Sequence, residues 1–94
     1  MEQKKINIKL EKEQAEGIYS NIVIVSHSPS EFIMDFARIM PGVNEAKVYS
    51  RIVMTPQNAK MFLKTMEDNI KRYEKQFGEI KVLNNREQNI GFTP

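Results

Sequence analysis

Hydrophobic and polar residues alternate near the start of the chain, in the pattern of a strand at the edge of a sheet. Ile6, Ile8 and Leu10 share one face, with polar residues between them, because successive side chains of a strand point to opposite faces. Residues 18–27 form a run rich in β-branched residues, which favours a second strand. Residues 47–54 alternate again and predict a further strand.

The segment at residues 28–40 fits two structures. As a helix, it would have Ser28 as its N-cap, Pro29 in its first turn and Glu31 as the second member of a capping box. As a strand, it would follow a hairpin closed by Ser28 and Pro29, and Asp35 would lie in its middle. The local signals alone slightly favour the helix.

The clearest element is an amphipathic helix over residues 56–77. Thr55 is a good N-cap, Pro56 suits the first helical position and Gly78 suits the C-cap. Apolar residues recur at steps of three and four and predict one continuous stripe: Ala59, Phe62, Leu63, Met66, Ile70, Tyr73 and Phe77. Residues 80–83 could form a short strand, and residues 84–94 are expected to be a flexible tail.

Three pairs of short blocks, in this order, carry a resemblance to a known family: Glu31-Phe32 with Asp35-Phe36, Arg51 with Thr55-Pro56, and Tyr73-Glu74 with Phe77-Gly78. Over about residues 17–80 the chain closely resembles domain-of-unknown-function family 3467, whose members are small bacterial and archaeal proteins. The resemblance implies no activity, cofactor or catalytic residue. It does imply β-branched residues around the block at residues 31–36, and we therefore expect a strand there.

We thus predict an α+β fold, with an antiparallel four-stranded meander followed by one long C-terminal amphipathic helix packed on one sheet face. Residues 1–83 are expected to form a single domain. The even-numbered face would receive the helix and make the core: Ile6, Ile8, Leu10, Ile22, Ile24, Phe32, Met34, Phe36, Val48, Ile52 and Met54. The odd-numbered face would carry Tyr19, Asn21, Val23, Val25, His27, Ile33, Asp35, Ala37, Ile39, Tyr49, Arg51 and Val53.

The odd-numbered face is too apolar for a sheet face open to water. An apolar surface with polar groups set into it is typical of an interaction site. We therefore predict that a second copy covers this face, sheet against sheet, and that Asn21, Asp35 and Arg51 form a polar row across it. The interaction surface would consist of Tyr19, Asn21, Asp35, Tyr49 and Arg51.

Composition narrows the chemistry. A chain of 94 residues buries roughly 60–65% of its unfolded surface, so a core made by one copy is marginal. Small domains without disulfides or metals commonly rely on oligomerisation. The chain has no cysteine and one histidine, which excludes a disulfide and a zinc site of the usual kind. We expect no metal, no cofactor and no enzymatic activity, with His27 at the end of a hairpin and the carboxylates of residues 11–16 in a solvated loop. We see no signal peptide and no membrane span, and expect a cytoplasmic protein.

The sequence therefore predicts a non-enzymatic module that forms a dimer or tetramer and takes part in protein–protein interaction, with an unidentified protein as a further partner. One alternative is a protein that binds single-stranded nucleic acid, with Tyr19 and Tyr49 as stacking platforms beside Arg51 and Lys47. The net charge of +2 gives this alternative little electrostatic support. A second alternative is a chaperone-like binder of unfolded chains, since six methionines supply adaptable apolar surface.

Overall fold

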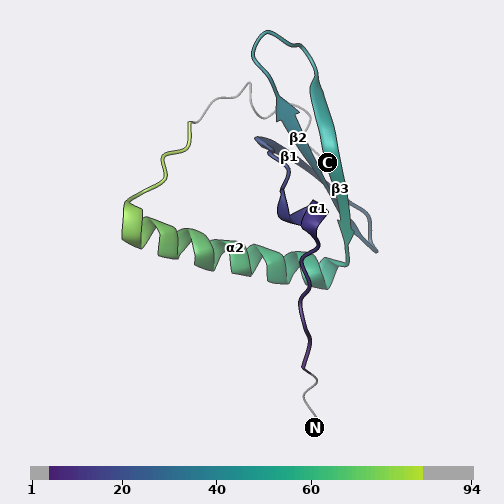
Figure 1. Ribbon diagram of the computed structural model, residues 1–94, viewed down its shortest axis with the longest axis vertical. Helices are drawn as coiled ribbons and strands as arrows, with labels where there is room; N and C mark the ends of the chain where they lie inside the picture. The colour runs from purple at the N-terminus through teal and green to yellow at the C-terminus, as the bar shows by residue number, and fades with distance from the viewer. Residues whose placement is uncertain (1–4, 84–94) are drawn as a thin grey trace.

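The computed structural model describes residues 5–83 and has the expected α+β class, with one sheet and a long C-terminal helix (Figure 1). The sheet has three antiparallel strands in the order β1-β2-β3. The elements in chain order are α1 (Lys12–Ala15), β1 (Ile22–His27), β2 (Phe32–Ile39), β3 (Ala46–Met54) and α2 (Pro56–Phe77).

The ambiguous segment is a strand, as the family resemblance implied. The residues that could have capped a helix instead close the hairpin between β1 and β2. The backbone N–H of Ser28 donates to the carbonyl of Glu31 at 2.9 Å. The Ser28 hydroxyl accepts from the N–H of Ser30 at 3.3 Å. Such local side-chain bonds let a serine stabilise a turn as readily as a helix start.

The predicted division of the sheet into even and odd faces is wrong for β1. Ile24 lies opposite Asp35, and Val23 lies opposite Phe36. Even positions of β1 therefore share a face with odd positions of β2, because directly opposed residues of an antiparallel pair lie on the same face. The turn sets this register, and a shift of one residue exchanges the two faces of a strand.

A register shift in the β2–β3 pair changes the faces a second time. Phe36 is opposite Ser50 but Ala37 is opposite Val48, so Tyr49 is an extra residue without a partner in β2. Such a bulge re-aims the side chains that follow it. It moves Val48 to the face that carries Ala37 rather than the face predicted for it.

Two faces result. The helix-side face is the one over which α1 and α2 lie, and we call the other the open face because no helix within residues 5–83 lies over it. The helix-side face carries Val23, Val25, His27, Phe32, Met34, Phe36, Ser50, Ile52 and Met54. Residues of this face line hollows together with α1 and with α2, so both helices lie on this side. The open face carries Ile22, Ile24, Ile33, Asp35, Ala37, Val48, Arg51 and Val53.

The fourth predicted strand is absent from the described part of the chain. Residues 5–10 are extended without a ladder partner, and Ile8 is 94% exposed. Alternation shows that a segment suits a sheet face, but a strand also needs an edge to pair with. Residues 80–83 form no strand either, and the acidic loop contains the single turn α1. The predicted tail at residues 84–94 lies outside the described residues.

Helix α2 forms as predicted, with both caps in place. The Thr55 hydroxyl oxygen accepts from the N–H of Asn58 at 3.1 Å. Gly78 has a φ of 100°, a conformation that favours glycine, and its N–H donates to the carbonyl of Glu74 at 2.8 Å. Only Thr55 separates β3 from α2, and the helix leaves the sheet in a direction that carries its C-terminal half beyond it (Figure 1).

The described residues contain almost no core. Only Ala37 and Asp35 are buried among them, and α2 contains no buried residue. The prediction that the sheet would bury the helix stripe within one copy is therefore wrong.

Candidate functional site

Asp35 and Arg51 lie directly opposite each other in the middle of the open face. Nε of Arg51 donates to Oδ1 of Asp35 at 2.7 Å, and a terminal guanidinium nitrogen donates to Oδ2 at 3.0 Å. This two-point geometry is the strongest form of a carboxylate–guanidinium pair. The side chain of Asp35 is 12% exposed and that of Arg51 is 63% exposed, so the pair has one enclosed end and one end in solvent.

The pair fixes the charges of both groups. Hydrogen bonds from Arg51, and then its positive charge, lower the pKa of Asp35 below its usual value, although partial burial opposes the shift. Asp35 raises the pKa of Arg51 in turn. A general acid or base works best when its pKa lies near the operating pH. Asp35 is moved away from that range, which favours a structural or recognition role.

A second group of polar side chains lies near the end of the sheet where Arg38 is opposite Lys47. The guanidinium of Arg38 lies over the ring of Tyr49 at 4.3 Å from its centroid and near the ring of Tyr19 at 5.7 Å. It also donates to the carbonyl of Tyr19 at 3.2 Å. Nζ of Lys47 is 4.9 Å from the Tyr49 ring centroid. We call these four residues the tyrosine–cation cluster.

Asn21 joins neither group. Its side-chain oxygen accepts from the N–H of Ile39 at 2.8 Å, and its side-chain nitrogen donates to the carbonyl of Ile39 at 3.0 Å. The amide thus extends the backbone pairing of β1 with β2 by one position. This role is structural and explains an asparagine at the start of a strand.

The five predicted interaction residues therefore fall into three places. Asp35 and Arg51 are together on the open face, as predicted. Tyr19 and Tyr49 come together around Arg38, and Asn21 binds the backbone, so the predicted polar row of Asn21, Asp35 and Arg51 does not form. The reason is the register of β1 and the bulge at Tyr49, neither of which alternation alone reveals. Arg38 was not among the predicted surface residues, and its position between the two tyrosines depends on that bulge.

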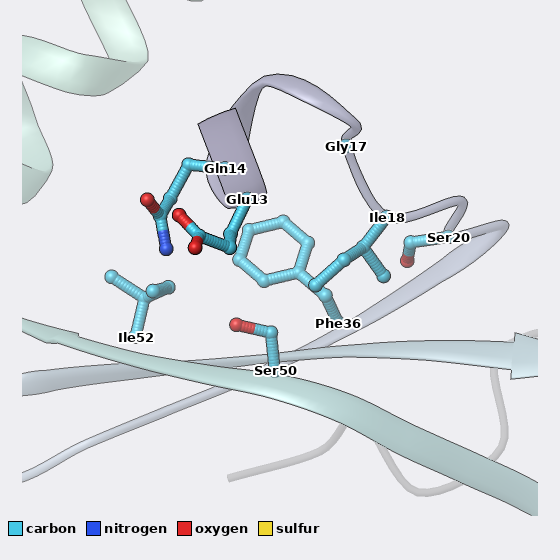
Figure 2. A pocket seen from close by; sticks show the side chains of 8 residues that line it. All are labelled: Glu13, Gln14, Gly17, Ile18, Ser20, Phe36, Ser50 and Ile52. Atoms are coloured by element: carbon cyan, nitrogen blue, oxygen red, sulfur yellow. The ribbon is translucent and has the colours of Figure 1, made fainter. Parts of the chain in front are cut away.

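A hollow of about 310 Å³ lies between α1 and the helix-side face (Figure 2). Phe36 and Ile52 point into it from the sheet, and Glu13 and Gln14 point into it from α1 (Figure 2). Its polar groups are one carboxylate, one amide and the hydroxyls of Ser20 and Ser50. No three potential metal ligands cluster anywhere within residues 5–83.

A second hollow, which we call the helix groove, lies between the sheet and the N-terminal half of α2. It has a volume of about 440 Å³. Apolar side chains form nearly all of its lining, and the single charged residue is Lys60. The lining residues are Val25, Phe32, Met34, Pro56, Ala59, Lys60, Phe62, Leu63 and Met66. This half of the apolar stripe was predictable from the sequence, but the chain's own sheet was expected to pack against it without leaving a groove.

His27 ends β1, as expected for a residue next to a hairpin. Its ring stacks on Phe32 with the centroids 5.4 Å apart. Its neighbours Ser26 and Ser28 form no nucleophile–base contact with it among the described hydrogen bonds. The histidine therefore contributes to packing on the helix-side face.

None of the helices within residues 5–83 has the length and apolar character needed to cross a membrane.

Comparison with known proteins gives a family and no characterised relative. No curated protein and no solved structure matches the sequence. The sequence profile of a family described as "Protein of unknown function (DUF3467)" matches residues 1–82. That match covers most of the chain, which therefore belongs to the DUF3467 family.

Proposed function

We propose that this protein is a non-enzymatic interaction module that works as a homo-oligomer. The observation that carries the proposal is the lack of a core in one copy: only Ala37 and Asp35 are buried among residues 5–83. A stable fold needs apolar burial to offset the loss of conformational entropy. A second copy is the simplest source of the missing burial.

The amount of exposed surface supports the same proposal. Large apolar side chains stay exposed on α2 and on both faces of the sheet, among them Leu63 at 58%, Val53 at 50% and Val25 at 44%. Exposed apolar surface of this extent is typical of an interaction site. It offers room for an interface between copies and for a further contact, either with more copies or with a different protein.

The placement of the reactive side chains supports a role in binding rather than catalysis. Asp35 is held as a carboxylate by Arg51, and His27 stacks on Phe32. Both side chains are therefore occupied by contacts with other residues of the sheet. We expect the module to act in the cytoplasm of a bacterium, with partners that are proteins.

Light scattering on the full chain tests the proposal. We expect a molar mass of two or four times 11.0 kDa, unchanged between low and high salt, because apolar burial is not screened by ions. A monomer with a cooperative unfolding transition would contradict the proposal. Such a result would show that one copy is stable without a partner.

The tyrosine–cation cluster supports a second candidate function, binding of single-stranded nucleic acid. Aromatic rings and cations together form the usual platform for unstacked bases. Against it, Arg38 already occupies the face of Tyr49. An anisotropy titration with a labelled single-stranded oligonucleotide tests this candidate, which requires binding that weakens as salt is added. Tyr49→Leu should abolish the binding. The control Lys71→Gln, on the exposed surface of α2, should leave it largely intact.

A further inference from the structure

The exposed stripe of α2 and the helix groove point to one specific assembly. We propose that two copies pair through α2 in antiparallel orientation, and that the C-terminal half of each helix covers the helix groove of the other copy. This inference rests on the proposed self-association and specifies the surface that carries it.

The spacing of the stripe is that of a coiled-coil seam. Six residues follow each other at steps of four, three, four, three and four: Ala59, Leu63, Met66, Ile70, Tyr73 and Phe77. Alternating steps of this kind keep one seam turned toward a partner helix along its whole length. The seam runs through nearly all of α2, whose 22 residues span about 33 Å.

Side-chain sizes favour the antiparallel arrangement. With the two helices fully overlapped, Ala59 meets the second copy's Phe77, Leu63 meets Tyr73 and Met66 meets Ile70. Each layer then combines a smaller with a larger side chain or two of similar size, which suits close packing. A parallel pair would instead set Phe77 against Phe77 at one end and Ala59 against Ala59 at the other.

The groove and the free end of the helix are complementary. The groove lies beside Ala59, Leu63 and Met66, whereas the exposed C-terminal half of α2 extends beyond the sheet (Figure 1). In the antiparallel pair, the second copy's C-terminal half comes to lie along the mouth of this groove. At about 440 Å³ the groove is larger than a cavity of roughly 150 Å³ that holds a benzene ring, so it can admit the rings of Tyr73 and Phe77.

Charge supports the same register. Lys60, the one charged residue of the groove lining, comes next to the second copy's Glu74, and symmetry repeats the contact. Within one helix these two residues are about 21 Å apart along the axis, so they cannot pair in a single copy. Glu67 faces its own counterpart near the two-fold axis, where solvent reduces the repulsion.

Distances between spin labels test the orientation. The chain has no cysteine, so single variants Met61→Cys, Asp68→Cys and Lys75→Cys can each carry one label on the exposed side of α2. The antiparallel pair predicts the shortest distance for residue 68. It predicts longer distances for residues 61 and 75, because their partners are offset by about 21 Å along the axis. Equal distances at all three positions would show a parallel pair and overturn the proposal.

Charge reversal tests the register. We expect Lys60→Glu and Glu74→Lys each to weaken dimerisation by roughly three- to tenfold, and the double variant to recover most of the loss. Glu74 also accepts a hydrogen bond from the N–H of Ile80, and the double-mutant cycle removes that contribution. Lys64→Glu is the matched control, because Lys64 lies off the seam and should show no coupling with Glu74→Lys.

The outcomes separate the two levels of the proposal. A monomeric chain would contradict both self-association and the helix pair. An oligomer whose residue 68 labels are as far apart as the labels at residues 61 and 75, or whose charge variants show no coupling, would contradict only the helix pair. A distance minimum at residue 68 together with recovery in the double variant is the expected result.

Discussion

Asp35 is the most enclosed charged residue in the described part of the chain, and Arg51 is what keeps it ionised. Because its pKa is lowered in the folded state, the folded chain binds fewer protons at this site than the unfolded chain over the acidic range. The stability that the pair contributes is therefore present above the unfolded pKa of about 3.8. It is lost as the pH falls through the lower pKa of the folded state.

We expect Asp35→Asn to reduce the free energy of unfolding at neutral pH, because it removes the carboxylate that Arg51 binds. The difference from the wild type should shrink as the pH falls below 4, where the wild-type carboxylate also becomes protonated. Urea unfolding of both proteins between pH 3 and pH 7 measures this difference in the free energy of unfolding. Glu45→Gln, at an exposed position between β2 and β3, is the control and should show almost no difference. A constant difference across the pH range would show that protonation of Asp35 does not cause the loss of stability in acid.

How far single residues could be predicted depended on register. The pairing of Asp35 with Arg51 followed from their shared face in the part of β2 and β3 where the register is regular. The positions of Tyr19 and Tyr49 did not follow, because an extra residue in β3 changes which side chains meet. Alternation counts residues along one strand, and the bulge is a property of two strands together.

At the scale of elements, the sequence was most informative where an element stabilises itself. Helix α2 and both of its caps were predictable, because capping groups and stripe lie within one segment. The strand predicted near residues 5–10 does not form, because its alternating pattern gives a face but no partner edge. Strand β2 required the family resemblance, since its local signals slightly favour a helix.

The N-cap of α2 offers a direct test at this scale. We expect Thr55→Ala to lower the free energy of unfolding by about 1 kcal/mol, because the N–H of Asn58 loses its acceptor. Thr65→Ala, at an exposed position inside the same helix, should be neutral or slightly stabilising, because alanine has the higher helix propensity. Equal losses in the two variants would show that the cap is not the stabilising contact.

At the scale of the whole molecule, the predicted and the observed structures differ most. The predicted fold has one sheet face covered by the chain's own helix and the other by a second copy. In the structure the helix leaves the sheet, and apolar surface remains on both sides. Binary patterning tells which side chains need burial, but it does not tell whether the same copy or another supplies it.

We therefore expect the stability of the protein to depend on its concentration. If folding and assembly are coupled, dilution favours the unfolded monomer and the melting temperature falls. Thermal unfolding followed by circular dichroism over a wide range of protein concentrations measures this. A melting temperature independent of concentration would indicate a stable single copy, against the proposed function.

The open face would remain after two copies pair through α2, because both helices lie on the other side of the sheet. Ile24, Ile33 and Val53 make this face apolar around the Asp35–Arg51 pair, and a second interface there would join two dimers into a tetramer. Asp35→Ala leaves the guanidinium of Arg51 without its partner in the middle of that face, and a charge brought unpaired into an interface is costly. In sedimentation experiments we expect this variant to shift tetramers toward dimers several-fold, whereas Glu45→Ala should behave as the wild type. Identical sedimentation of the two variants would mean that the open face takes no part in assembly and is free for another protein.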